Sequence, residues 1–176
     1  MPITPDSKNW TWVLSERCPD CGFDATTLAF RDVPALVRSN AAAWPDRLLR
    51  ADARIRPDDS TWSPLEYAAH VRDVFRIFAL RLELMLTREA PTFANWDQDE
   101  TAIAEGYRGQ DPLVVATELQ SAANVVAAAF ERVSDADLAR TGLRSDGSIF
   151  TVETLALYFA HDPVHHLFDV TGRPVA

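Results

Sequence analysis

The chain has 176 residues, of which 47% are hydrophobic and 24% are charged, and this length and composition fit a single globular domain. Its net charge of −9 argues against nucleic-acid binding and against docking on an anionic membrane, since both need a basic face. The sequence contains no apolar run of about 18 residues, so no transmembrane helix is predicted. The first residues also lack the pattern of a signal peptide. We therefore expect a cytoplasmic monomer or homodimer with no nucleic-acid or membrane partner.

Four long stretches have helical periodicity, and the first covers residues 25–51. Its apolar residues recur about three and four positions apart, as they do on one face of an α-helix. Pro34 and Pro45 are expected to break or kink this stretch, because proline lacks the N–H that a helix interior needs.

The second stretch begins at a sharp start signal. Ser63, Pro64 and Glu66 have the spacing of a capping box with a proline in the first helical turn. The helical pattern continues from there to Arg88, and His70 falls on its apolar face.

Two further helices are predicted in the second half of the chain. A cap and a proline start the third, over residues 111–133, and a short helical turn is expected after it. Residues 144–148 have the composition of a tight turn. The fourth helix is expected from about residue 151 to just before Gly172, because glycine is a common stop.

Strand signals are nearly absent. Residues 10–14 alternate weakly and could pair with another segment, and residues 89–110 form a long connection of the kind that is often functional. The predicted fold is all-α, a four-helix bundle over residues 25–176. Residues 1–24 are expected to form a short N-terminal extension.

The four histidines carry the main chemical signal. His161 and His165 are four residues apart on a predicted helix and therefore face the same way, whereas His166 points elsewhere. His70 lies on the inward face of the second helix. A single buried histidine is more often a hydrogen-bonded core residue, but the three together favour a metal site with a vacant fourth position. Zinc is the first choice, and nickel, iron(II) or copper(II) would also accept imidazole.

Three other residues near these histidines have less defined roles. His166 is expected to be exposed or to act only through a ligand. Asp73 and Asp162 are the acids nearest the predicted ligands in the sequence. Either could accept an imidazole N–H and orient the ring, or could be a solvated helix acid.

Cys18 and Cys21 form a Cys-x-x-Cys pair followed by Gly22. This is half of a zinc site, since the chain has no other cysteine. The pair could be a redox couple, a metal site completed by a partner subunit, or a structural hairpin. We expect it to be structural or redox-responsive and not to perform the main reaction, because the extension is expected to need little contact with the bundle core.

The sequence resembles the DinB-like superfamily, which includes mycothiol-dependent maleylpyruvate isomerases and bacterial-thiol S-transferases. The resemblance covers about residues 25–170. It rests on three segments: WSPLEYAAH at 62–70, FTV at 150–152 and HDPVHH at 161–166.

The resemblance implies a four-helix bundle with a long crossover between the second and third helices. It also implies a divalent metal, typically zinc or nickel, held by one histidine of the second helix and two residues of the fourth. These positions match His70, His161 and His165. In the isomerase branch one ligand of the fourth helix is a glutamate, where this chain has His161.

The implied activity is a metal-dependent transfer or isomerisation that uses mycothiol or another low-molecular-weight thiol and a small electrophile. Arg72 and Arg76, and also Arg81, could bind carboxylates of the thiol or the substrate, or could be solvated. The alternatives are a metal-dependent hydrolase, in which water replaces the thiol, and a non-catalytic metal-binding or stress-response protein. The sequence itself does not assign a catalytic residue.

Overall fold

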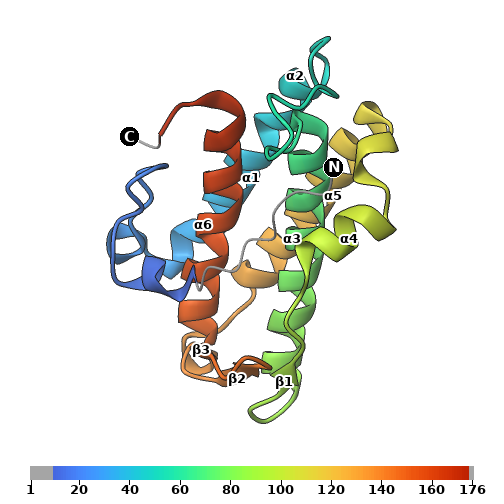
Figure 1. Cartoon of the computed structure of the whole chain (residues 1–176). Coiled ribbons are helices and arrows are strands. Elements are labelled where there is room, and N and C mark those ends of the chain that lie inside the picture. The colour runs from blue at the N-terminus through green and yellow to red at the C-terminus, as the bar shows by residue number, and fades with distance from the viewer. Residues whose placement is uncertain (1–9, 175–176) are drawn as a thin grey trace.

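The computed structural model describes residues 10–174 and confirms the predicted four-helix bundle (Figure 1). Its helices are α1 (Val33–Ala42), α2 (Trp44–Leu48), α3 (Pro64–Thr87), α4 (Gln98–Ala104), α5 (Pro112–Glu131) and α6 (Val152–Thr171). Short 3₁₀ turns are η1 (Trp10–Leu14), η2 (Ala25–Thr27), η3 (Phe30–Asp32), η4 (Tyr107–Gly109) and η5 (Asp135–Asp137). Helix α3 packs against α5 and α6, and α1 packs against the same two helices. Residues on α3 can therefore meet residues on α6 directly.

The long helices begin and end at the predicted signals. Ser63 and Glu66 form the complete capping box of α3, and Thr151 caps α6 in the same way. Gly172 ends α6 with a φ of +63°, a conformation that glycine adopts without strain. These local signals set the axial position of both helices that carry the histidines.

The first predicted helix is shorter than expected. Residues 25–32 form the turns η2 and η3, and α1 begins only at Val33, with Pro34 in its first turn. Proline is tolerated there because the first N–H groups of a helix have no partner within it. Pro45 likewise lies in the first turn of the separate helix α2, so both prolines mark helix starts.

A small sheet was not predicted. The strands are β1 (Thr92–Phe93), β2 (Thr141–Arg144) and β3 (Ile149–Thr151), with β1 parallel to β2 and β2 antiparallel to β3. The tight turn predicted at 144–148 is the hairpin between β2 and β3. By contrast, the weak strand signal at residues 10–14 was wrong, because this segment is the turn η1.

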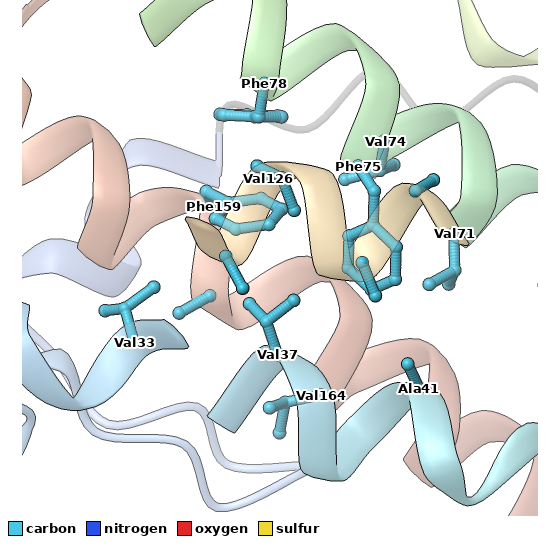
Figure 2. Packing of buried hydrophobic residues seen from close by; sticks show 14 of the residues in the cluster. Val33, Val37, Ala41, Val71, Val74, Phe75, Phe78, Val126, Phe159 and Val164 are labelled. Carbon is cyan, nitrogen blue, oxygen red and sulfur yellow. The ribbon is translucent and has the colours of Figure 1, made fainter. Parts of the chain in front are cut away.

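The core is formed by apolar side chains from the four bundle helices. Phe159 is central to it and stacks on Phe78 and Phe130, with ring centroids 4.9 and 5.6 Å apart. Figure 2 labels Val33, Val37, Ala41, Val71, Val74, Phe75, Phe78, Val126, Phe159 and Val164 of this cluster. Helix α5 is apolar and long enough to span a membrane by composition alone, but it packs in this bundle, and a bundle helix meets the same criterion.

The N-terminal segment also belongs to the core. Cys18, Cys21 and Phe23 are buried in the same apolar cluster as the bundle helices, and η1, η2 and η3 all contact α6. The expectation that this extension makes little contact with the bundle was therefore wrong.

Candidate metal centre

Helix α6 presents two adjacent pairs of possible ligands. Asp162 and His166 form one pair and His161 and His165 the other, each with a spacing of four residues. Each pair shares a face because four residues complete slightly more than one helical turn. The two pairs are offset by one residue, which rotates them by about 100° around the helix axis. They therefore face different neighbours.

The first pair faces α3, where it meets His70. Ligand atoms of His70, Asp162 and His166 all lie within 4.8 Å of one another. Asp162 Oδ1 is 3.4 Å from His70 Nε2 and 3.7 Å from His166 Nε2. The rings of His70 and His166 meet edge to face, with centroids 4.7 Å apart. We call this set the cavity cluster.

The cavity cluster fits a cation because it contains buried polar atoms without a hydrogen-bond partner. These are Nδ1 and Nε2 of His70 and Oδ1 of Asp162, among residues 10–174. Unsatisfied buried polar atoms are rare and costly. A divalent cation bound by these donors would compensate that cost.

The charge states of the cavity cluster also suit a cation. Burial lowers the pKa of His70, so its imidazole is neutral at pH 7 and has a lone pair to donate. Burial alone would raise the pKa of Asp162, but His70 and His166 outweigh it and hold the pKa at about 2. The cluster thus offers two imidazoles and one carboxylate.

The second pair on α6 faces the N-terminal segment. His161 and His165 lie with Cys18 and Cys21, again with all donor atoms within 4.8 Å. The structure therefore divides the predicted trio: His70 lies with Asp162 and His166, and the other two histidines lie with the cysteines. His166, expected to be exposed or indirect, is a member of the cavity cluster.

A cavity of about 500 Å³ opens beside the cavity cluster. The long connection between α3 and α5 supplies part of its wall, including Trp96, whose ring stacks on His70 with centroids 5.2 Å apart. Other lining residues are Trp10, Val74, Phe78, Arg81, Asn95, Asp97, Gln98, Asp99, Arg144, Asp146, Tyr158, His161, Asp162, His165 and His166. A small molecule in this space would contact Asp162 and His166.

Two arginines line the cavity, and Arg81 has an unusual environment. It is 7% exposed, donates to the Ala94 carbonyl at 3.1 Å, and forms no ion pair within the described part of the chain. Burial and the nearby Arg144 lower the pKa of Arg81 to about 10, so it still carries a charge at pH 7. Arg144 donates to Asp146 at 2.8 Å and to the Tyr158 hydroxyl at 3.1 Å.

The arginines proposed from the sequence as carboxylate ligands have other partners. Arg72 donates two hydrogen bonds to Asp73 and one to Glu118, and Arg76 donates to the same two carboxylates. Neither arginine lines the cavity. Their carboxylate partners are thus residues of this chain, and Arg81 and Arg144 are the guanidinium groups that face the cavity.

The comparison with known families agrees with this architecture. A model of the DinB superfamily matches residues 35–168, which is most of the chain. The chain belongs to the DinB superfamily. No functionally curated protein matches the sequence.

The DinB bundle also has a solved structural relative. The chain is similar to YfiT from Bacillus subtilis, with a TM-score of 0.65 and 19% sequence identity, over 97% of this chain and 90% of YfiT. YfiT is described as a probable metal-dependent hydrolase with an unusual four-helix bundle topology. At this identity the likeness establishes the shared fold.

Proposed function

We propose that this DinB-superfamily protein is a metal-dependent enzyme in which His70, Asp162 and His166 bind a divalent cation. The observation that carries the proposal is the cavity cluster itself, with its three donors within 4.8 Å and its buried polar atoms that have no hydrogen-bond partner among residues 10–174. Three protein ligands beside a cavity are typical of a catalytic site, which keeps one position for a reactant. Zinc or nickel is the expected cation, since both accept imidazole and carboxylate ligands.

The nucleophile that we favour is a low-molecular-weight thiol such as mycothiol. When bound, the dication lowers the pKa of a thiol or a water molecule, so that the nucleophilic form is present at neutral pH. In the isomerase branch one metal ligand of the last helix is a glutamate, at the position that the sequence matches to His161. Asp162 supplies a carboxylate in the cavity cluster, one methylene shorter than glutamate, and this supports the thiol-dependent reaction.

Arg81 gives the cavity a position for the negatively charged group of a small substrate. Arg81 has no carboxylate partner of its own among residues 10–174, so its guanidinium is available to a carboxylate of the substrate or of the thiol. Tyr158 and Arg144 lie on the same wall. Trp96 covers His70 and shields that side of the cluster from water. These residues would bind and orient the substrate while the cation activates the nucleophile.

Hydrolysis is the second candidate function. It is supported by the description of YfiT as a probable metal-dependent hydrolase, since YfiT shares the fold over most of both chains. In that case water would take the place of the thiol, and the same arginines would orient an anionic substrate. A protein that binds metal without catalysis is the remaining alternative.

The test is a paired assay of the zinc- and nickel-loaded protein. One arm measures consumption of mycothiol with a small carboxylate-bearing electrophile such as maleylpyruvate. The other measures hydrolysis of carboxylate-bearing esters and amides without thiol. His70→Ala, which removes a cavity ligand, is the control for both arms. Thiol-dependent turnover that His70→Ala abolishes supports the transferase or isomerase, and thiol-independent turnover supports the hydrolase. A metal-loaded protein that is inactive in both arms would contradict the enzymatic proposal for these substrate classes.

A further inference from the structure

We propose that Cys18, Cys21, His161 and His165 form a second metal site, a closed structural zinc centre that joins the N-terminal segment to α6. We call these four residues the cysteine–histidine cluster. Their four donor atoms lie within 4.8 Å of one another. Cys18 and Cys21 are 1% and 0% exposed and His161 is 5% exposed, whereas His165 is only partly buried where it lines the cavity.

The two thiols are held by a tight turn. The N–H of Cys18 donates to the Phe23 carbonyl at 2.8 Å, and the N–H of Gly22 donates to the Cys18 carbonyl at 3.0 Å. Gly22 has a φ of +79°, which glycine adopts without strain, and this lets the chain reverse directly after Cys21. Both sulfur atoms are thereby directed to the same side of the turn.

The two imidazoles complete the set from α6. Cys18 Sγ lies 3.6 Å from His165 Nδ1, although 147 positions separate these residues. Nε2 of His161 is buried without a hydrogen-bond partner in the described chain. Aromatic rings cover the site, with Trp10 centred 5.4 Å from the His161 ring and 5.3 Å from the His165 ring. A buried, unpartnered nitrogen beside two thiols indicates a ligand that is common to all of them.

The donor set selects zinc. Two thiolates and two imidazoles are a frequent tetrahedral zinc set, and the spacings Cys-x₂-Cys and His-x₃-His fall within those of structural zinc sites. Two thiolates neutralise the dication, which matters because a buried net charge is costly. Binding would release two protons from the thiols. A disulfide between Cys18 and Cys21 would instead leave His161 Nε2 without a partner.

The two clusters differ in their chemistry. The cysteine–histidine cluster has four protein ligands, enough to complete a tetrahedral site, whereas the cavity cluster has three and leaves a position open. His161 and His165 line the cavity as Asp162 and His166 do, so the number of ligands distinguishes the two clusters. Four protein ligands are typical of structural sites and three of catalytic ones. Because the two ligand pairs are offset by one residue on α6, zinc at the cysteine–histidine cluster would also fix the rotation of Asp162 and His166 toward His70. This positioning role is an addition to the proposed function and does not depend on it.

The proposal can be tested on the intact protein without any substitution. Zinc-loaded wild-type protein should show sulfur scatterers at about 2.3 Å in X-ray absorption. Cobalt(II)-loaded protein should show the thiolate-to-metal charge-transfer band that nitrogen and oxygen ligands do not produce. Zinc- or cobalt-loaded protein with only nitrogen and oxygen ligands would overturn the proposal, whatever the outcome for activity.

A matched pair of variants separates the two sites. Wild-type protein should bind two equivalents of zinc per chain. The double variant Cys18→Ser with Cys21→Ser should bind one equivalent and lose the cobalt charge-transfer band. His70→Ala should also bind one equivalent but retain the band in full. A cysteine double variant that is folded by circular dichroism and still binds two equivalents would contradict the proposal. If the cysteine double variant does not fold, the proposal is tested with His70→Ala alone. The single metal that His70→Ala binds must then have two sulfur ligands, and a metal without them would contradict the proposal.

Discussion

Neighbouring residues on α6 belong to different clusters because the helix rotates about 100° at each residue. His165 contacts Cys18 of the N-terminal segment, whereas the ring of His166 lies against His70 of α3. The two side chains have the same chemistry and differ only in direction. Their effects on metal binding should therefore separate cleanly in single variants.

We predict that His166→Ala and Asp162→Asn each reduce the metal content of the protein by one equivalent. The lost equivalent should be the one without sulfur ligands, because both residues belong to the cavity cluster. His165→Ala should instead weaken the cobalt charge-transfer band. Elemental analysis and visible absorption of the cobalt-loaded variants measure both effects. A His166→Ala protein that binds as much metal as wild type would instead favour the trio His70, His161 and His165 expected from the sequence.

Arg81 and Arg76 provide a second contrast at the residue scale. Arg81→Gln removes from the cavity a buried guanidinium that has no carboxylate partner among residues 10–174, and we expect KM for the anionic substrate to rise about 10- to 150-fold, the effect of losing a charged hydrogen bond of about 1.5–3 kcal/mol. Arg76→Gln should leave KM within about twofold, because Arg76 contacts Asp73 and Glu118 away from the cavity. Steady-state kinetics of both variants test this. The reverse pattern would support the carboxylate-binding role that the sequence suggested for Arg76.

The start of α3 is held by a buried ion pair. Glu66 is 2% exposed, accepts hydrogen bonds from the N–H and hydroxyl of Ser63, and pairs with Arg56 of the preceding loop. Burial alone would raise the pKa of Glu66, but the hydrogen bonds from Arg56 and Ser63 outweigh it, so its pKa is below the usual value. This arrangement fixes the first turn of α3, one turn before His70.

We predict that Glu66→Gln destabilises the protein by about 3 kcal/mol, because it removes the buried carboxylate that pairs with the partly buried Arg56. The pair also gives a pH dependence. A carboxyl group whose pKa is lowered by folding stabilises the native state above its unfolded pKa near 4.3, and this contribution is lost as the pH falls through the folded value. Urea unfolding at pH 7 and at pH 3, well below the unfolded pKa, should show a smaller difference for Glu66→Gln than for wild type. Equal pH dependence in both proteins would exclude this role of Glu66.

The elements predicted correctly are those whose ends have local chemical signals. Caps, prolines and Gly172 locate α3, α5 and α6 because each signal acts within a few residues. The strands have two to four residues, too few for an alternating pattern to emerge. The start of the first helix was misplaced because apolar spacing continues through the 3₁₀ turns before Val33.

The candidate site could be predicted only in part, because it depends on how the helices pack and not on local signals. Periodicity shows that His161 and His165 share a face and that His70 lies inside the bundle, and both features are present. Which face of α6 meets α3 depends on how the helices rotate as they pack, and no local signal determines that rotation. Asp162 and His166 are also four residues apart. If carboxylates had been counted as metal ligands in the sequence, this pair would have been as good a candidate as His161 and His165.

At the scale of the whole molecule, the charge distribution bears on possible partners. The net charge is −9, and several arginines already contact carboxylates of the same chain, as Arg38 does with Glu131. We therefore predict no binding to duplex DNA at physiological ionic strength, because phosphate contacts need free basic groups. Fluorescence anisotropy of a labelled duplex, titrated at several salt concentrations, measures this. Binding that weakens steeply with salt would refute the prediction.

The whole molecule should also depend on metal for its stability. Zinc at the cysteine–histidine cluster would connect Cys18 to His165 across 147 positions of the chain, and a cross-link that closes a long loop restricts the unfolded state most. The size of the stabilisation follows from mass action, since a ligand present at about 1,000 times its Kd stabilises the native state by about 4 kcal/mol. We predict that chelation lowers the Tm of His70→Ala, which retains only this site, by several degrees or more.

The cysteine double variant provides the comparison that assigns this effect. Cys18→Ser with Cys21→Ser retains only the cavity cluster, whose ligands come from α3 and α6, two helices that pack together through the apolar core. Its Tm should start lower than that of His70→Ala and should fall less on chelation. Differential scanning calorimetry with and without a chelator, at one protein concentration, measures all four values. A His70→Ala protein that unfolds at the same temperature with and without chelator would show that the N-terminal segment is held to α6 by its apolar contacts alone.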